Sequence, residues 1–280
     1  MLVLLKISLV IVGAGYLGLL VLLYLGQEWL MFPGKTNQGT KYAHVKPGEG
    51  EELLTLPTPA GDTVAALFGK ALTPDGKIRP DARQCPTLIY FYGNGMCLQD
   101  ALYEFGEYRR LGVNMIVPDY LGYGLSSGTP SEQGCYAAAD AVYEHLHLRT
   151  DIDQKKIVAL GRSLGSGVAV DLAARKPLAG LITFSAYTSM VEMGKTSYPV
   201  VPVSLLLKHR FESIGKIQQV TCPILFGHGK RDDVIPYTMT HELAQKAKAP
   251  VTEFYVDHLG HNDFWGETTI HPLQKFLSQF

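Results

Sequence analysis

The fold is decided by the stretch Lys156-Ile-Val-Ala-Leu-Gly-Arg-Ser-Leu-Gly-Ser-Gly167. It predicts a short apolar strand, a Gly-x-Ser-x-Gly turn and the start of a helix. A turn this tight holds its serine in strained backbone, and the glycines on either side avoid steric clash. It lifts the Ser163 hydroxyl clear of the sheet and points the Leu164 N–H at a developing oxyanion. The pentapeptide alone is a weak signal, which the strand–turn–helix context strengthens.

A serine hydroxyl also needs a base to become a nucleophile. In this kind of architecture the partners follow the serine in the order acid, then histidine. Asp232 comes soon after the apolar strand 224–226, and His261 follows the strand 252–256. Loops that follow parallel strands share one edge of the sheet. The sequence therefore predicts a catalytic triad of Ser163, Asp232 and His261.

Each partner has a neighbour that offers the same chemistry. Asp233 adjoins Asp232, and His258 lies three residues before His261. His228 stands just past its expected strand, where a structural hydrogen-bonding role is the commoner one. Spacing alone leaves these alternatives open. The competing acids and bases are Asp233, Asp257, Asp263, His228 and His258.

Short apolar strands alternate with helical segments from residue 87 onward. This alternation predicts an α/β fold with a mainly parallel sheet and helices on both faces. Two earlier strands, joined by a Gly61-Asp62 turn without a helix, predict an antiparallel edge. The long interval 186–215 predicts a cap over the carboxyl ends of the strands. The expected strands are 53–56, 63–68, 87–92, 114–117, 156–160, 181–184, 224–226 and 252–256. The expected helices are 98–111, 132–148, 168–174, 238–248 and 268–280.

The N-terminal region carries an uncharged, apolar run from residue 7 to 27. A helix of that length spans about 30 Å, the thickness of a bilayer core. Tyr24 and Trp29 stand near its end, where an aromatic belt belongs. We expect a single-pass transmembrane anchor over residues 1–30. Lys6 on the short flank favours an N-inside orientation, although one lysine leaves the side of the following domain open.

Three other interpretations of this run compete with the anchor. A cleaved signal peptide has a shorter apolar region and a small-residue cleavage site, which this run does not offer. Gly13-Ala-Gly-Tyr-Leu-Gly18 matches the dinucleotide fingerprint G-x-G-x-x-G, but no second strand ending in an acid follows it. A buried core helix is seldom this long.

Composition excludes several classes of function. Apolar residues make up 46% of the 280 and charged residues 18%, which is typical of a globular chain. The 25 basic and 26 acidic residues balance, so no basic footprint for a nucleic acid is present. The four cysteines form no C-x-x-C pair, and we expect buried thiols and neither a metal site nor a cofactor.

These motifs together resemble the α/β-hydrolase superfamily, in the branch of membrane-anchored serine hydrolases that includes depalmitoylase-like proteins. The resemblance covers residue 30 to the C-terminus. It implies an anchor over 1–30, a connector over 31–51 and an α/β-hydrolase domain over 52–280. The segments that carry it are Phe32-Pro33, Tyr92-Gly-Asn-Gly95, Pro118-Asp-Tyr-Leu-Gly-Tyr-Gly124, Gly161–Gly165, His228-Gly-Lys-Arg-Asp232, Ile235-Pro236 and Gly260-His-Asn-Asp263.

The resemblance also implies roles for particular residues. Its spacing favours Asp232 and His261 over their neighbours, and it places the Asn94 N–H in the oxyanion hole beside that of Leu164. Two positions depart from the family pattern. Tyr92 stands where relatives usually have histidine, and Leu121 where arginine is common. Neither is a triad position, so catalysis is expected to survive the change.

The function expected from these residues is hydrolysis of an ester or thioester, including lipid-like or acylated substrates, through an acyl-enzyme. A serine at the turn counts against the dehalogenase and epoxide-hydrolase chemistries. Two alternatives remain open: a serine aminopeptidase on the same fold, recognisable by hydrolysis of aminoacyl amides, and a non-catalytic scaffold. Oligomeric state is left open.

Overall fold

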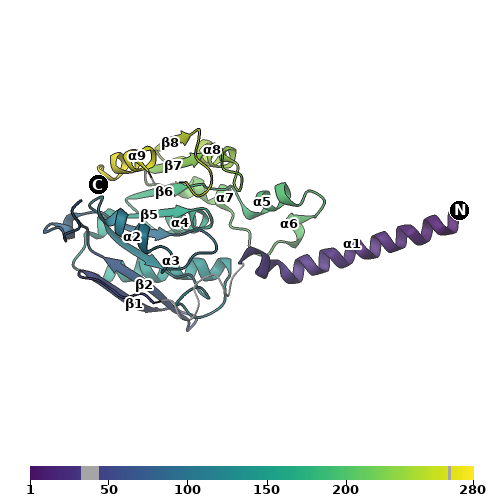
Figure 1. Cartoon of the computed structure of the whole chain (residues 1–280), viewed down its shortest axis with the longest axis horizontal. Helices are drawn as coiled ribbons and strands as arrows, with labels where there is room; N and C mark the ends of the chain where they lie inside the picture. The colour runs from purple at the N-terminus through teal and green to yellow at the C-terminus, as the bar shows by residue number, and fades with distance from the viewer. Residues whose placement is uncertain (33–43, 264–265) are drawn as a thin grey trace.

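The computed structural model describes residues 1–32, 44–263 and 266–280. A long helix, α1 (Leu2–Met31), precedes a domain built on one eight-stranded sheet (Figure 1). Most of the connector expected over 31–51 falls on residues 33–43, which lie outside the described residues, as does Pro33.

The sheet has the strand order β1-β2-β4-β3-β5-β6-β7-β8. β1 and β2 pair antiparallel, β2 pairs antiparallel with β4, and every other pair is parallel. This confirms the predicted mainly parallel sheet and its antiparallel edge. The strands are β1 (Glu51–Pro57), β2 (Thr63–Gly69), β3 (Thr87–Phe91), β4 (Asn114–Pro118), β5 (Ile157–Arg162), β6 (Gly180–Phe184), β7 (Ile224–Gly229) and β8 (Val251–Val256).

The helices that follow the strands place their apolar sides on the sheet. Ser131 caps α3, because its side chain accepts a hydrogen bond from the Gly134 N–H. The helix expected from residue 98 begins later, at Leu102, because the preceding residues form turns in which the Ala101 and Leu102 N–H groups bond to carbonyls three residues back. The helices are α2 (Leu102–Arg109), α3 (Glu132–Leu148), α4 (Leu164–Arg175), α8 (Tyr237–Lys246) and α9 (Glu267–Leu277).

The segment expected as a cap contains three short helices, α5 (Met190–Ser197), α6 (Val203–Leu206) and α7 (Ser213–Lys216). α5 and α6 lie beside the C-terminal end of α1 (Figure 1). α7 instead packs on α4, where Lys216 forms an ion pair with Asp171 at 2.7 Å. The part of the segment next to the anchor is therefore α5, α6 and the loop between them.

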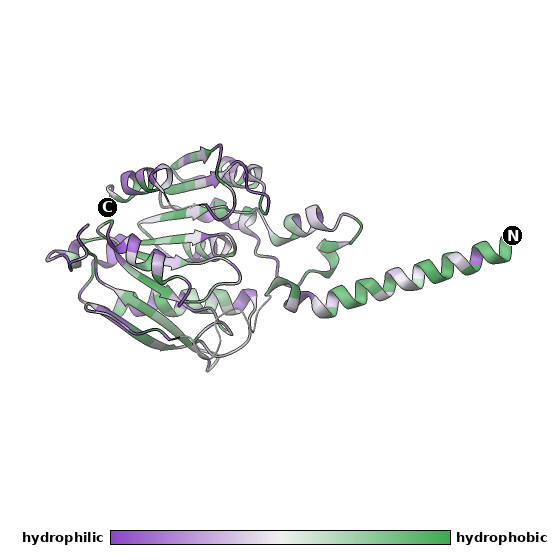
Figure 2. Cartoon of the chain, viewed as in Figure 1, coloured by the Kyte–Doolittle hydropathy of each residue, from purple (hydrophilic) through white to green (hydrophobic). Residues whose placement is uncertain are grey.

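The helix α1 projects from the domain as an apolar rod (Figure 2). It is 30 residues long, and none of its most apolar window is buried, so it is no core helix. By length and composition it is long enough to cross a membrane. Residues 13–18 lie inside this continuous helix with no strand before them, which excludes the dinucleotide fingerprint. All four cysteines are buried and free.

Candidate active site

Ser163 occupies a strained turn between β5 and α4. Its φ of 52° and ψ of −122° lie outside the regions that a non-glycine residue normally adopts. The flanking glycines are required by packing. A Cβ on Gly161 would lie 2.3 Å from the Gly165 carbonyl oxygen, and one on Gly165 would lie 2.0 Å from the Phe91 carbonyl oxygen. The motif glycines therefore allow β3, β5 and α4 to approach one another while Ser163 stays half-buried.

Three side chains meet at the carboxyl edge of the sheet. Ser163 Oγ lies 3.0 Å from His261 Nε2, and His261 Nδ1 lies 2.8 Å from Asp232 Oδ2. Their side chains follow β5, β8 and β7 respectively. The Asp232 side chain is fully buried and the His261 side chain is 12% exposed. The hydrogen bonds therefore connect a partly accessible histidine to a buried acid. This is the geometry that a general base and its orienting acid require.

Asp232 is held by more partners than His261 alone. Its Oδ2 also accepts from the Ser185 hydroxyl at 2.8 Å, and its Oδ1 accepts from the N–H groups of Val234 and Ile235 at 2.9 and 2.7 Å. Burial raises the pKa of this carboxyl, but the hydrogen bonds outweigh burial and hold the pKa well below its ordinary value. Asp232 is therefore a carboxylate at neutral pH, fixed on both oxygens.

His228 is a second histidine on the same carboxylate. It lies inside β7 rather than just past the strand, fully buried, with Nε2 3.0 Å from Asp232 Oδ2. Its Nδ1 lies 2.6 Å from the Thr240 hydroxyl, which also lies 2.8 Å from the Ala186 carbonyl oxygen. The sequence left His228 open between a competing base and a structural hydrogen-bonding role, and it gave no sign of Ser185. Ser185 carries a φ of 50° directly after β6, with no motif to mark it.

The competing acids and bases lie elsewhere. Asp233 and His258 are exposed, and Asp257 pairs with Lys230 at 2.8 Å. Asp263 accepts from the Gly260 N–H at 2.9 Å and so shapes the turn that presents His261. Within the described ranges, no cluster of three or more His, Cys, Asp or Glu side chains could hold a metal ion.

The loop after β3 approaches the serine from the other side. A Cβ on Gly93 would lie 3.4 Å from Ser163 Cβ, so the loop backbone passes next to the nucleophile. The Asn94 side chain donates to the Met31 carbonyl at 2.7 Å and accepts from the Tyr123 hydroxyl at 3.1 Å. Leu164 is the first residue of α4, where N–H groups have no acceptor within the helix.

A buried network supports this loop from below. Asp119 accepts hydrogen bonds from the N–H groups of Leu98 and Leu125 and from the Tyr92 hydroxyl, at 2.6, 2.7 and 2.9 Å. Asp119 therefore fixes the backbone of two loops, those that contain Leu98 and Leu125. Burial raises the pKa of Asp119 to about 6, although the two N–H hydrogen bonds act in the opposite direction and lower it. Tyr92, one of the two positions that depart from the expected family pattern, contacts this acid through its hydroxyl.

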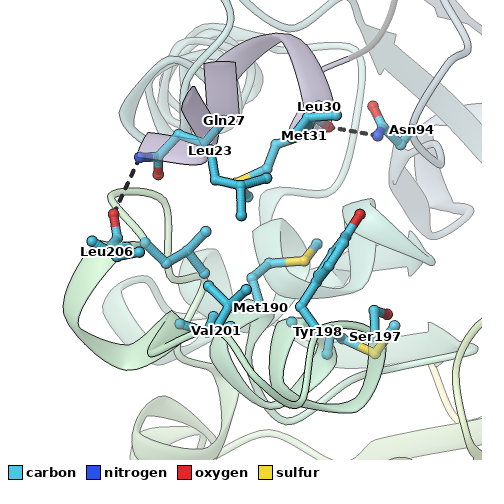
Figure 3. A pocket seen from close by; sticks show the side chains of 14 residues that line it. Leu23, Gln27, Leu30, Met31, Asn94, Met190, Ser197, Tyr198, Val201 and Leu206 are labelled. Carbon is cyan, nitrogen blue, oxygen red and sulfur yellow. Dashed lines mark hydrogen bonds between the residues drawn. The ribbon is translucent and has the colours of Figure 1, made fainter. Parts of the chain in front are cut away.

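An apolar cavity of about 290 Å³ lies between α1 and the α5–α6 segment, with Asn94 at one side (Figure 3). α1 contributes Leu23, Gln27 and Met31, and the opposite wall includes Met190, Val201 and Leu206. Sequence reasoning expected a cap here but gave no reason for the anchor to form part of the wall.

A mainly parallel sheet with a serine in the strand–turn–helix elbow, and an acid and a histidine after later strands, defines an α/β hydrolase. The Dienelactone hydrolase family model matches residues 127–259. Two solved structures share the fold. The acetyl xylan esterase of Paenibacillus sp. R4 has a TM-score of 0.64 at 13% identity, covering 90% of this chain and 93% of that one. An esterase of Pyrococcus furiosus has a TM-score of 0.62 at 15% identity, covering 82% and 92%.

Sequence relatives place the chain more narrowly. Human alpha/beta hydrolase domain-containing protein 17B is 32% identical over 231 residues, covering 81% of this chain and 75% of that protein. An uncharacterized protein of Mycobacterium tuberculosis is 38% identical over 172 residues, covering 60% of this chain and 61% of its own length. The chain belongs to the α/β-hydrolase domain-containing family that includes protein 17B, and it spans about three fifths of the length of the Mycobacterium tuberculosis relative.

Proposed function

We propose that this chain is a membrane-anchored serine hydrolase that cleaves an ester or thioester through a Ser-His-Asp triad and an acyl-enzyme. The observation that carries the proposal is the continuous hydrogen-bonded path from Ser163 Oγ through His261 to the buried Asp232 carboxylate. An orienting acid on Nδ1 leaves the Nε2 lone pair directed at the hydroxyl, which is the arrangement that makes a serine nucleophilic.

The proposed reaction begins with attack of Ser163 Oγ on the substrate carbonyl carbon while His261 Nε2 accepts the hydroxyl proton. The imidazolium is stabilised by Asp232. Collapse of the tetrahedral intermediate breaks the bond to the alcohol or thiol, which leaves with the proton from His261. Water then attacks the acyl-enzyme with His261 again as the base, and the acid is released.

The negative oxygen of the intermediate needs donors that are already in place. We assign this role to the backbone N–H groups of Asn94 and Leu164. Support comes from the position of Leu164 at the first turn of α4 and from the close approach of the Gly93 backbone to Ser163. Two such donors contribute several kcal/mol to transition-state binding, about 3–4 for each one removed.

The membrane assignment rests on α1. A 30-residue apolar helix with exposed side chains exceeds the length that a bilayer core requires. Ester substrates are favoured by the names of two structural neighbours, both called esterases. Apolar walls beside the active-site loop favour a lipid-like or acylated substrate over a small polar one.

The test is labelling of the detergent-solubilised full chain with a fluorophosphonate probe. Wild type is expected to label, and Ser163→Ala and His261→Ala are expected to lose labelling while keeping the thermal unfolding midpoint within a few degrees. Well-folded wild type that fails to label would refute the activated serine. Labelling that persists in Ser163→Ala would move the nucleophile elsewhere.

A further inference from the structure

The cavity between α1 and the α5–α6 segment is built from both the anchor and the domain. Leu23, Leu30 and Met31 of α1 face Met190, Val201 and Leu206 across it (Figure 3). Few polar groups interrupt this lining. An apolar cavity of about 290 Å³ is close to the lower limit for small-molecule sites, and an extended hydrocarbon chain suits its composition.

One side of the cavity reaches the catalytic loop. Asn94 belongs to its wall, and the same side chain donates to the carbonyl of Met31, the last residue of α1. The backbone one residue earlier, at Gly93, passes against Ser163. A chain lying in the cavity therefore has its end next to the proposed oxyanion hole.

The other side follows the anchor toward the bilayer. The Tyr16 hydroxyl donates to the Val200 carbonyl at 2.6 Å, and Gln27 donates to the Leu206 carbonyl at 3.1 Å. Tyr16 lies about 16 Å along the helix from Gln27, well inside the uncharged stretch. Val200 is 73% exposed and Leu205 is 83% exposed, so the loop presents apolar side chains next to the lipid-facing helix.

The backbone of this loop is suited to lipid. Irregular backbone is tolerated at membrane depth only when its polar groups are satisfied. Pro199 and Pro202 have no N–H to satisfy. The Val201 N–H donates to the Tyr198 carbonyl and the Leu205 N–H donates to the Pro202 carbonyl, at 3.0 Å each. The Val200 carbonyl accepts from the Tyr16 hydroxyl, as described above.

Charges appear where the cavity meets the end of the apolar helix. Lys208 lies 3.6 Å from Glu28 and 4.7 Å from the centre of the Tyr24 ring. Lysine and tyrosine at this level are typical of the membrane–water interface. The membrane–water interface therefore falls near residues 24–28 of α1. The active site lies on the aqueous side of this interface, and the α5–α6 loop lies on the lipid side.

We propose that the cavity between α1 and the α5–α6 segment is an acyl-chain site that opens laterally to the bilayer, so that a membrane-embedded ester or thioester enters with its carbonyl at Ser163. This inference rests on the proposed function and adds where the acyl chain binds, against α1 itself, and the route by which it enters, from the bilayer. The anchor is thereby part of the substrate site.

The test compares two pairs of neighbouring residues in the full chain. Leu206→Trp and Leu23→Trp fill the cavity, whereas Leu205→Trp and Leu22→Trp place the same indole on the exposed neighbour. The assay is kcat/KM for p-nitrophenyl esters from acetyl to octanoyl, below their aggregation concentrations. In wild type we expect about a fourfold rise for each added methylene. In the two cavity variants the octanoyl-to-acetyl ratio is expected to fall at least about 100-fold, and in the two controls to stay within about threefold.

The route of entry has its own readout. In phosphatidylcholine vesicles, brominated acyl chains are expected to quench the fluorescence that Leu205→Trp adds to wild type. Absence of that quenching would overturn lateral entry. A chain-length profile unchanged in Leu206→Trp and Leu23→Trp, with fluorophosphonate labelling present in wild type, would overturn the acyl site alone. Wild type that neither labels nor hydrolyses any ester would overturn the proposed function and the acyl site with it.

Discussion

Replacing Asp232 by asparagine tests the catalytic assignment most sharply, because the surroundings dictate how the new amide must sit. Oδ1 accepts from two backbone N–H groups, those of Val234 and Ile235, which cannot change their polarity. The amide oxygen is therefore expected to take the Oδ1 position. The NH₂ group then takes the Oδ2 position and points at His261 Nδ1, while the Ser185 hydroxyl, which now donates to Oδ2, rotates to accept from the amide.

That orientation reverses the tautomer of the histidine. Nδ1 must now accept, so the ring proton moves to Nε2, the nitrogen 3.0 Å from Ser163 Oγ. A protonated Nε2 cannot take the serine proton. Loss of the correct tautomer in a serine-protease triad costs about 10⁴-fold in kcat, or about 5.5 kcal/mol of transition-state stabilisation. We expect a loss of that order for Asp232→Asn.

The assay is the second-order rate of fluorophosphonate labelling together with kcat for a p-nitrophenyl ester. Asp233→Asn is the matched control, because Asp233 is adjacent and exposed. It is expected to stay within about twofold of wild type. An Asp232→Asn variant that folds with native thermal stability and keeps more than a tenth of wild-type activity would refute the role assigned to the acid.

Four further predictions follow from the structure. The pKa of Asp232 is depressed in the folded chain, so its ionised form stabilises the fold above the unfolded pKa of about 3.9, and that contribution is lost as pH falls below it. Between pH 5 and 3, Asp232→Asn should therefore lose less free energy of unfolding in urea titrations than wild type; equal losses would contradict the depressed pKa. Gly165→Ala should cost about 3 kcal/mol or more, because the new Cβ would lie 2.0 Å from the Phe91 carbonyl oxygen, while Gly215→Ala, with open space around it, should stay within about 0.5 kcal/mol in the same denaturation assay. Tyr92→Phe removes a donor to Asp119 and an acceptor for the Tyr120 N–H, and should cost about 1–3 kcal/mol by the same measurement; a neutral result would show that water replaces the hydroxyl. Leu17→Arg places a charge at the middle of the uncharged run 7–27 and should disfavour insertion by about 2.5–3.5 kcal/mol, which shifts protein into the soluble fraction after carbonate extraction; full retention in the pellet would argue against a spanning helix.

Much of this fold could be predicted from local pattern. The predicted bounds of α3 match the structure because Ser131 supplies the helix cap. The buried parallel strands were found because they read as unbroken apolar runs, although β7 continues three residues beyond its predicted end, through His228 to Gly229. The predicted start of α2 was wrong because residues 98–101 form turns closed by hydrogen bonds between residues three apart. The Leu98 N–H is held by Asp119, which lies 21 residues away in the sequence, so no local signal marks where the loop ends.

The site shows the same division between local and distant information. Ser163, Asp232 and His261 each follow a strand, so topology alone places them at one edge. Ser185 belongs to no motif, and the motif that contains His228 gives that residue no defined role. The contact of Ser185 with Asp232 depends on the packing of β6 against β7, and that of His228 on the turn that follows β7. The contribution of α1 to the cavity wall could not be predicted either. The periodicity of apolar residues shows which face of a helix is apolar, but it does not show what packs opposite that face.

The hydrogen bond from Asn94 to the Met31 carbonyl joins the last turn of α1 to the loop beside Ser163 through one side chain. In a chain anchored in a membrane by α1, as we propose, this link would hold Ser163 at a fixed distance from the lipid surface. Acyl bonds at the level of the headgroups would then come within reach of Ser163, whereas acyl groups carried far from the membrane on a soluble partner would not. The choice of substrate would thus depend on the distance of the acyl bond from the membrane as well as on the chemistry of the acyl chain.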